Sequence, residues 1–520
     1  MTSDLTAPHP SQHLVNPIVN ALRRDADRPL LQMAGGEPWT GRQVLEAISR
    51  YVQALRSRGV KGGRRVALLA GNSVEVVILH NAIGYAGAGL VTMHPLGSAD
   101  DHLYSIEDSE VEALIYDPQK FEARAAELKA RSTRLRTVLS LGDGGIGEDL
   151  NTLAATFTPG PLERPEVPAD YIPRLSYSGG TTGTPKAIPG NPRSGAMAQQ
   201  IMLQEWEWPV EPRILAVVPL SHAGGTLFGP ALLKHGSMVI LPSFDAGAVL
   251  EAIQTYRISC TMLVPTMIYA LLDHPQLDHY DLSSLETVFY GASLMSPARL
   301  KEAIERIGPV FFQFYGQAEA PMTVCTMRRS EHDPDNPLRM ASCGRPVPYV
   351  DVALLDDECR EVPDGEPGEI CVRGALVMDG YLNREAQNRE ALAGGWLHTG
   401  DVAVKDPDGF LRIVDRKKDM IVTGGFNVFP SEVENVIASH PAVAQVAVFG
   451  VPDQKWGEAV TAAVVLRPGA TAKAEELIAL VREHKGSVQA PKSVRFIDRI
   501  PLTAVGKPDK KALKAHYAAA

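Results

Sequence analysis

Short apolar runs alternate with longer amphipathic segments over the first third of the chain. Arg65–Ala70 is a nearly continuous apolar run of the kind found in buried strands, and Val74–Gly87 has a helix-like pattern. Two more short runs, Glu112–Tyr116 and Val138–Leu141, follow with polar segments between them. Strand–helix alternation of this kind favours a parallel α/β sheet.

A linker with five prolines, residues 158–173, leads into a second region that shows the same alternation. Its expected strands are Ile214–Pro219, Ser237–Leu241, Cys260–Val264, Thr287–Tyr290 and Val310–Phe314. From about residue 344 to residue 414 the pattern changes to short strands and turns, which indicates a small β subdomain.

The pattern from residue 416 onwards predicts a separate α+β unit. Ser431 and Glu434 match a capping box ahead of apolar positions, which predicts a helix start. Val443–Phe449 and Ala459–Leu466 have strand patterns, and Ala474–Glu483 has a helical one. We therefore expect an α/β protein with an N-terminal domain at 1–415, subdivided at about 1–170, 171–343 and 344–415, and a C-terminal domain at 416–520.

Composition narrows the class of protein. The 520 residues are 45% hydrophobic and 22% charged, as in an ordinary globular enzyme. No apolar run reaches the roughly 18 residues of a membrane span, and the N-terminus lacks a signal-peptide layout. Five cysteines without CxxC spacing argue against a metal site and a disulfide framework. These features predict a cytoplasmic protein.

Charge is distributed unevenly along the chain. Residues 416–520 hold 15 Lys and Arg against 10 Asp and Glu, whereas the whole chain has a net charge of −10. An acidic chain without a basic run is a poor nucleic-acid binder. A basic small domain beside an acidic large one suits closure over a polyanion, although a plain surface bias explains the charge equally well.

A glycine- and threonine-rich loop, residues 178–186, follows the strand pattern of Tyr171–Tyr177. Its glycines let the backbone approach an anion closely, and its hydroxyls and one lysine add donors and positive charge, which suits a triphosphate. The loop differs from a Walker A motif because Pro185 precedes Lys186 and no helix can begin at once. By itself, such a loop is more often a surface turn.

Seven further motifs follow this loop in order. They are Pro219-Leu220-Ser221-His222-Ala223-Gly224-Gly225, Tyr290-Gly291-Ala292-Ser293, Tyr315-Gly316-Gln317-Ala318-Glu319, Gly395-Trp396-Leu397-His398-Thr399-Gly400-Asp401, Asp415-Arg416-Lys417-Lys418-Asp419, Thr423-Gly424-Gly425-Phe426-Asn427 and Gly506-Lys507-Pro508-Asp509-Lys510. Together with the loop they resemble the adenylate-forming superfamily of acyl-CoA synthetases, nonribosomal adenylation domains and luciferases. The resemblance spans roughly residues 40–515.

The resemblance implies a two-step reaction and a fold. ATP would activate a carboxylic acid, aryl or fatty, to an acyl-adenylate with release of pyrophosphate, and the acyl group would then pass to coenzyme A. The implied cofactors are ATP, Mg²⁺ and coenzyme A. The implied fold has two α/β subdomains and a β-barrel-like subdomain, followed by a mobile C-terminal lid.

Residue roles are carried over from the family motifs by position. The resemblance implies that Glu319 and Thr181 are associated with Mg²⁺, that Asp401 accepts from the ribose hydroxyls, and that Arg416 adds a ribose or phosphate contact. The remaining implied nucleotide-binding residues are Ser178, Gly179, Gly180, Thr181, Thr182, Gly183 and Lys186 at the phosphates, and Gly291, Ala292, Ser293, Tyr315, Gly316 and Gln317 near adenine.

The same resemblance implies catalytic and conformational roles. Lys507 would reach from the lid to the oxygens that join the carboxylate and the α-phosphate, where an ammonium offsets charge on both reactants. Lys418 would be the hinge, and Gly424 and Gly425 would line the pantetheine tunnel. His222 would line the acyl site.

Three departures from the family pattern keep alternatives open. Ala318 replaces a threonine that contacts the α-phosphate, Gly179 replaces a common serine, and Ala187 replaces a common glycine. An amine acceptor, as in amide synthetases, or nitrite as the activated acid, as in diazotases, is therefore retained as an alternative. Loading of a carrier protein is a further alternative, and loss of catalysis is disfavoured. The oligomeric state and the particular acid are left open.

Overall fold

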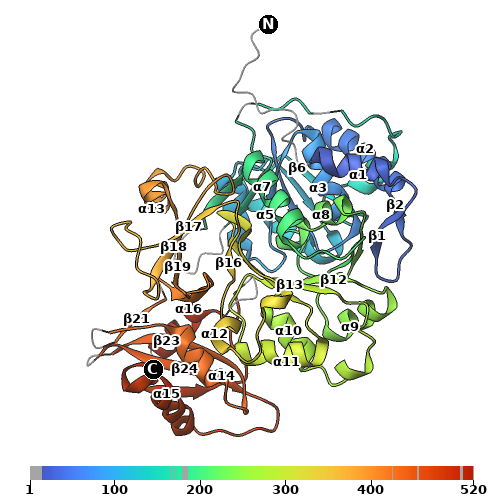
Figure 1. Cartoon of the computed structure of the whole chain (residues 1–520). Coiled ribbons are helices and arrows are strands. Elements are labelled where there is room, and N and C mark those ends of the chain that lie inside the picture. The colour runs from blue at the N-terminus through green and yellow to red at the C-terminus, as the bar shows by residue number, and fades with distance from the viewer. Residues whose placement is uncertain are drawn as a thin grey trace.

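The computed structural model describes residues 15–163, 165–168, 170–177, 185–417, 419–423, 426–453, 456–503 and 508–518, which form four sheets (Figure 1). One sheet has the order β7-β6-β5-β3-β4-β8-β9 and is parallel except for the β8–β9 pair. Its strands are β3 (Arg65–Leu69), β4 (Gly89–Thr92), β5 (Ala113–Tyr116), β6 (Thr137–Ser140), β7 (Glu148–Asp149), β8 (Arg174–Tyr177) and β9 (Ala187–Gly190).

The largest sheet has the order β16-β15-β14-β13-β12-β10-β11-β1-β2. Its inner strands are parallel, and β2, β15 and β16 add antiparallel edges. The strands are β1 (Pro29–Met33), β2 (Trp39–Thr40), β10 (Arg213–Ala216), β11 (Ser237–Ile240), β12 (Cys260–Leu263), β13 (Thr287–Gly291), β14 (Phe311–Gln317), β15 (Ala320–Met327) and β16 (Arg345–Pro346).

Helices cover these two sheets, as the alternating pattern predicts. The helices next in sequence to the strands of the seven-stranded sheet are α2 (Gly41–Ser57), α3 (Val74–Ala86), α4 (Ala99–Asp108), α5 (Pro118–Arg131) and α6 (Leu150–Ala155). The others up to residue 340 are α1 (Val15–Arg24), α7 (Pro192–Glu205), α8 (Phe228–Leu233), α9 (Ala246–Thr255), α10 (Pro265–Leu272), α11 (Pro297–Ile307) and α12 (Pro337–Met340). No described helix is long and apolar enough to cross a membrane.

An antiparallel sheet follows in the order β17-β18-β19-β20. It consists of β17 (Asp351–Leu355), β18 (Gly368–Arg373), β19 (Leu397–Lys405) and β20 (Leu411–Arg416), with α13 (Glu385–Ala391) between β18 and β19. Buried residues alternate with partly exposed ones along most of β19, since one face of this sheet packs on the core.

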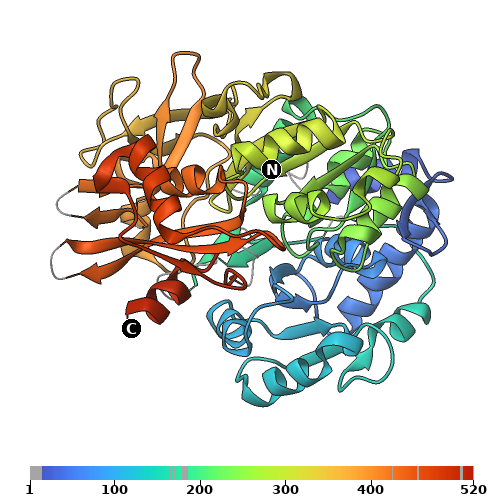
Figure 2. The ribbon, with the colours of Figure 1, turned by 90° about the horizontal axis from the view of Figure 1, so that it is seen from below.

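The C-terminal segment forms its own lobe beside this sheet (orange-red to red in Figures 1 and 2). Its sheet has the order β22-β21-β24-β23, with β25 paired to β24. The elements are β21 (Ile421–Thr423), β22 (Phe426–Val428), α14 (Pro430–Ala438), β23 (Val443–Asp453), β24 (Gly457–Leu466), α15 (Ala474–Gln489), β25 (Ser493–Phe496) and α16 (Lys510–Ala518). Apolar side chains of α14, α15 and the two long strands β23 and β24 form a separate core.

The predicted α/β fold class is confirmed, with a large N-terminal and a small C-terminal domain. Sheet membership nevertheless crosses the subdomain limit predicted near residue 170. Strands β1 and β2 join the largest sheet, whereas β8 and β9 join the sheet built mainly from residues 65–149. The exact domain limits remain predictions.

The predicted capping box at Ser431 is wrong, although the helix it announced exists. Helix α14 begins at Pro430, and no side chain caps its first turn. The Ser431 amide donates to Asp415 at 3.1 Å and its hydroxyl donates to the Val414 carbonyl. Glu434 instead accepts from the Val448 amide at 2.7 Å. Tertiary partners therefore replace the local cap.

Candidate functional site

Three of the predicted nucleotide-binding residues meet where the largest sheet approaches the antiparallel sheet. The Tyr315 hydroxyl donates to Asp401 Oδ2 at 2.7 Å, and Arg416 Nε donates to Asp401 Oδ1 at 3.0 Å. Tyr315 lies on β14, Asp401 on β19 and Arg416 on β20, so the junction joins residues up to about a hundred positions apart. Both oxygens of one carboxylate are thereby oriented by donors from different elements.

Strand pairing sets this geometry. Asp401 and Arg416 are direct partners in the β19–β20 pair. The Asp401 amide donates to the Thr399 hydroxyl at 3.1 Å, and that hydroxyl donates to the Ile370 carbonyl at 2.6 Å. Gly400, between them, has φ +72°, which a side chain would strain. The strand therefore turns locally to present Asp401.

Electrostatic interactions stabilise the contacts among Tyr315, Asp401 and Arg416. Asp401 is buried, with a side-chain exposure of 7%, while Arg416 keeps 44% of its side chain exposed. The negative charge of Asp401 raises the pKa of Arg416, and burial together with Asp401 raises the pKa of Tyr315 well above 10. Tyr315 is therefore a fixed hydroxyl donor, and Arg416 a fixed cation, at neutral pH.

A second group links the predicted phosphate-loop lysine with the predicted metal-associated carboxylate. The Tyr381 hydroxyl donates to Glu319 Oε1 at 3.0 Å, and Lys186 Nζ lies 4.6 Å from the centroid of the Tyr381 ring. A cation over an aromatic face is favourable. Tyr381 thus connects Lys186 and Glu319. The sequence motifs did not indicate this role, because Tyr381 lies between two motifs and belongs to neither.

The predicted adenine-side residues lie at the ends of β13 and β14. A Cβ on Gly291 would lie 2.2 Å from the Phe314 carbonyl oxygen, and one on Gly316 would lie 2.6 Å from that of Met322. Only glycine fits either position. Ala292 adopts φ +66°, a left-handed conformation that costs about 1–2 kcal/mol for an L-residue.

Two further predicted residues extend from these strand ends. Ser293 follows Ala292 in a bend. The Gln317 side-chain amide donates to the Thr399 carbonyl at 3.3 Å and so ties the end of β14 to the segment that carries Asp401. A hydrogen bond therefore links the residues predicted near adenine with those predicted near the ribose.

His222 lies in a different group of side chains, beside Ser221 and His94. Its Nδ1 is 2.9 Å from the Ser221 hydroxyl, and its ring meets the His94 ring edge-on at 4.6 Å between centroids. Burial, with smaller contributions from His94 and Arg174, lowers the pKa of His222 to about 3. The imidazole is therefore uncharged at neutral pH.

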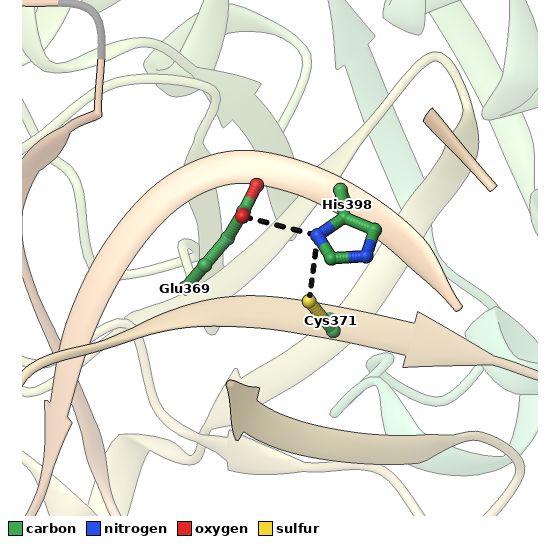
Figure 3. A group of neighbouring side chains, drawn as sticks. All are labelled: Glu369, Cys371 and His398. Atoms are coloured by element: carbon green, nitrogen blue, oxygen red, sulfur yellow. Dashed lines mark hydrogen bonds and ion pairs between the residues drawn. The ribbon is translucent and has the colours of Figure 1, made fainter. Parts of the chain in front are cut away.

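A buried cluster supports the strand that carries Asp401 (Figure 3). His398 Nδ1 lies 3.1 Å from Glu369 Oε2 and 3.4 Å from Cys371 Sγ. These three side chains have the composition of a soft-metal site. Glu369, however, also accepts from Lys417 Nζ at 3.2 Å and from the Gly400 amide at 2.8 Å. Protein donors already satisfy the Glu369 carboxylate, so we interpret the cluster as a structural support for the segment that carries Asp401.

Several predicted site residues lie outside the described residues. These are Ser178, Gly179, Gly180, Thr181, Thr182, Gly183, Lys418, Gly424, Gly425 and Lys507. Their predicted neighbours on the chain are described: Lys186 follows the loop, and Arg416, Lys417 and Asp419 flank the hinge position.

The fold and the two residue groups define an adenylate-forming enzyme with a separate C-terminal domain. Residues 19–382 match the family model of the AMP-binding enzyme, and residues 432–507 match that of the AMP-binding enzyme C-terminal domain. The chain therefore belongs to the AMP-binding enzyme family.

Individual relatives cover nearly the whole chain. The chain is 48% identical to the medium/long-chain-fatty-acid–CoA ligase FadD8 of Mycobacterium tuberculosis, over 99% of this chain and 91% of that protein. It is 33% identical to the amide bond synthetase McbA from Marinactinospora thermotolerans, with a TM-score of 0.89 over 98% of this chain and 100% of McbA.

Two structures of MatB from Rhodopseudomonas palustris, each 27% identical to the chain, match it unequally. Both comparisons cover 98% of this chain and 99% of MatB. The TM-score is 0.88 for the ATP-bound structure and 0.77 for the apo structure.

Proposed function

We propose that the protein is an AMP-forming acid–thiol ligase that converts a carboxylic acid, ATP and coenzyme A into an acyl-CoA thioester. The observation that carries this proposal is the junction of Tyr315, Asp401 and Arg416 beside the Lys186–Tyr381–Glu319 group. The high identity to a fatty-acid–CoA ligase supports the acid and thiol parts of the proposal.

In the first half-reaction a carboxylate oxygen attacks the α-phosphorus of ATP, and pyrophosphate leaves. Negative charge grows on the reacting oxygens and the leaving group, so fixed cations lower the barrier. Lys186 and Arg416 would supply positive charge, Asp401 would orient the ribose, and Lys507 would bridge the two reactants. Glu319 and Thr181 offer oxygen ligands suited to Mg²⁺, which would neutralise phosphate charge when bound.

In the second half-reaction the thiol sulfur attacks the carbonyl carbon of the adenylate. A carbon–sulfur bond forms, the bond from carbon to the phosphate oxygen breaks, and AMP leaves while the thiol loses its proton. Lys507 must withdraw for the thiol to enter. Rotation about Lys418 would present Gly424 and Gly425 to the pantetheine arm.

Pyrophosphate release and thioester formation, measured separately, test this function. The purified protein should release pyrophosphate with ATP, Mg²⁺ and an aliphatic or aryl acid, and mass spectrometry should detect the acyl-CoA when coenzyme A is added. Release with nitrite alone would favour a diazotase. Failure to release pyrophosphate with any acid would contradict the proposal.

An amine acceptor is the second candidate. The whole-length match to an amide bond synthetase favours it, as does Ala318, which replaces a hydroxyl residue near the α-phosphate in the family pattern. Replacing coenzyme A by a panel of primary amines distinguishes the two. Amide formed faster than thioester would favour the second candidate.

A further inference from the structure

A partly buried arginine outside the predicted site lies next to His222. Arg174 begins β8, and its Nη2 donates to the Ser221 carbonyl at 2.8 Å. Burial lowers the pKa of Arg174 to about 10, so the guanidinium still carries its charge at neutral pH. Within the described residues, no Asp or Glu forms a salt bridge with Arg174, and no carboxylate contributes to its pKa shift. Sequence motifs gave no sign of it.

The groups around Arg174 carry no compensating charge. His80, on α3, and His222 both lie close enough for the arginine to lower their pKa values, which burial brings to about 3. His94 contacts His222, and burial lowers the pKa of His94 to about 4. All three imidazoles are therefore neutral near pH 7, and Arg174 is an uncompensated cation among them.

An unpaired buried charge is costly, because proteins normally pair buried charges with a counter-ion. A second group in the cluster is also unsatisfied: His80 Nε2 is inaccessible to solvent and has no hydrogen-bond partner among the described residues. Arg174, His80 and His222 each retain partial exposure elsewhere on the residue. A cation without a counter-ion and an imidazole nitrogen without a hydrogen-bond partner together indicate a ligand with acceptor oxygens.

The position of the cluster relates it to the acid. Gly225 lies against it, since a Cβ there would approach His80 Cε1 to 3.1 Å. The next residue, Thr226, donates to the sulfur of Met322 at 3.6 Å, and Met322 follows Glu319 on β15. Arg174 pairs with Gly190 whereas Tyr177 pairs with Ala187, so Arg174 lies roughly 10 Å along the strand from the end next to Lys186.

We propose that Arg174, with His80, forms a polar subsite for an acceptor oxygen on the tail of the acid, remote from the reacting carboxylate. This inference rests on the proposed function, because it assumes that the acid lies beside His222. A second carboxylate fits best, since it supplies the missing negative charge. An oxo group would use the same donors.

Three acids of equal chain length test the subsite: an unbranched alkanoic acid, the oxo acid and the dicarboxylic acid, each over a range of lengths. The expected result is that kcat/KM for pyrophosphate release is higher with an oxygen-bearing acid than with the plain acid. Arg174→Met should reduce that preference at least about tenfold, as expected for a hydrogen bond to a charged group. Preference for the dicarboxylic acid over the oxo acid identifies a carboxylate.

Matched variants separate this role from folding. Arg213 also begins a parallel strand and donates to a backbone carbonyl, that of Tyr256 at 2.8 Å, but it is exposed. Arg213→Met should leave the preference unchanged, and thermal unfolding checks each variant. If Arg174→Met fails to fold, Arg174→Lys keeps the charge and should favour the carboxylate over the oxo group more strongly than the wild type does.

Two results would overturn the subsite while the proposed function stands. One is thioester formation in which the wild type prefers the plain acid at every length. The other is an Arg174→Met variant that slows all three acids equally, which would place Arg174 at the reacting carboxylate or in the scaffold. If, by contrast, none of the acids supports pyrophosphate release, the proposed function itself is contradicted.

Discussion

At the scale of single residues, Asp401 is held by Tyr315 and Arg416 before any ligand arrives. Pre-orientation lowers the ordering cost of binding, so the proposed ribose contact benefits directly. We expect Asp401→Asn to raise the KM for ATP at least about tenfold, since a hydrogen bond to a charged group contributes about 1.5–3 kcal/mol. ATP titrations of pyrophosphate release measure this change.

Asp351 provides the control for that variant. It pairs with Arg373 at 3.0 Å on the same antiparallel sheet, but both side chains are exposed. Asp351→Asn should leave the KM for ATP unchanged. An equal effect of both variants would show that Asp401 acts only through the stability of the sheet.

Tyr381 supports a prediction about Mg²⁺, because its hydroxyl orients Glu319 while its ring lies under Lys186. Tyr381→Phe removes only the hydroxyl and should raise the Mg²⁺ concentration for half-maximal rate about fivefold, the effect of roughly 1 kcal/mol. Tyr381→Ala also removes the ring and should raise the KM for ATP. Mg²⁺ and ATP titrations of the two variants separate these contributions.

A surface tyrosine tests the specificity of that result. The Tyr349 hydroxyl donates to Gln204 and not to Glu319, so Tyr349→Phe should not change the Mg²⁺ titration. The idea that Tyr381 orients Glu319 fails if Tyr381→Phe titrates with Mg²⁺ like the wild type.

The sequence motifs identified those site residues that lie inside a motif with a recognisable spacing. Tyr315 and Glu319 lie in one motif, and Asp401 follows Thr399 and Gly400 in another. Tyr381 and Arg174 gave no such signal. Their contacts join segments dozens of residues apart, and a single tyrosine or arginine in a sequence is more often an ordinary surface or packing residue.

At the scale of elements, β20 and α14 are joined by a buried carboxylate. Asp415 accepts from the amides of Arg416 at 2.6 Å and Ser431 at 3.1 Å. Burial raises the pKa of Asp415 from its ordinary 3.8 to about 6, and Glu434 adds to this, while Lys510 opposes it. Lys510 in turn pairs with Glu434 at 2.8 Å.

The raised pKa gives Asp415 a defined effect on stability. Between about pH 4 and pH 6 the folded state binds more protons than the unfolded state, so the free energy of unfolding falls as the pH rises. Two pKa units correspond to about 3 kcal/mol. Asp415→Asn should therefore gain stability relative to the wild type as the pH rises from 4 to 7, measured by urea unfolding.

The opposite sign is expected for an exposed aspartate in a turn. Hydrogen bonds from Arg360 lower the pKa of Asp356, so its contribution to stability is present above the unfolded pKa and is lost as the pH falls. Asp356→Asn should lose stability relative to the wild type as the pH rises. Parallel curves for Asp415→Asn and the wild type would contradict the assignment.

Element prediction succeeded where burial leaves a local signature. Strand β3 was expected at Arg65–Ala70 and spans Arg65–Leu69, because a strand buried on both faces is a continuous apolar run. The same signature cannot show which sheet a strand joins. Strand β1 pairs with β11, some two hundred residues later, and no local pattern encodes that pairing. Ser431 was misassigned for a similar reason, since Asp415 is not a local neighbour.

At the scale of the whole molecule, ion pairs join the C-terminal domain to the N-terminal domain. Arg412 on β20 pairs with Glu432 on α14 at 3.0 Å, and Arg467 lies 4.0 Å from Glu302 on α11. These two ion pairs join the C-terminal domain to β20 and α11 of the N-terminal domain.

If the lid alternates between two states, variants on its two faces should separate the half-reactions. Lys507→Ala should abolish adenylate formation yet spare thioester formation from a supplied acyl-adenylate, because the ammonium is required only while two anions are brought together. Gly425→Leu should block thioester formation while pyrophosphate release continues, since its side chain would occupy the proposed tunnel. Single-turnover assays of each half-reaction measure both variants. Equal loss of both half-reactions in either variant would mean that the lid presents one face throughout the cycle.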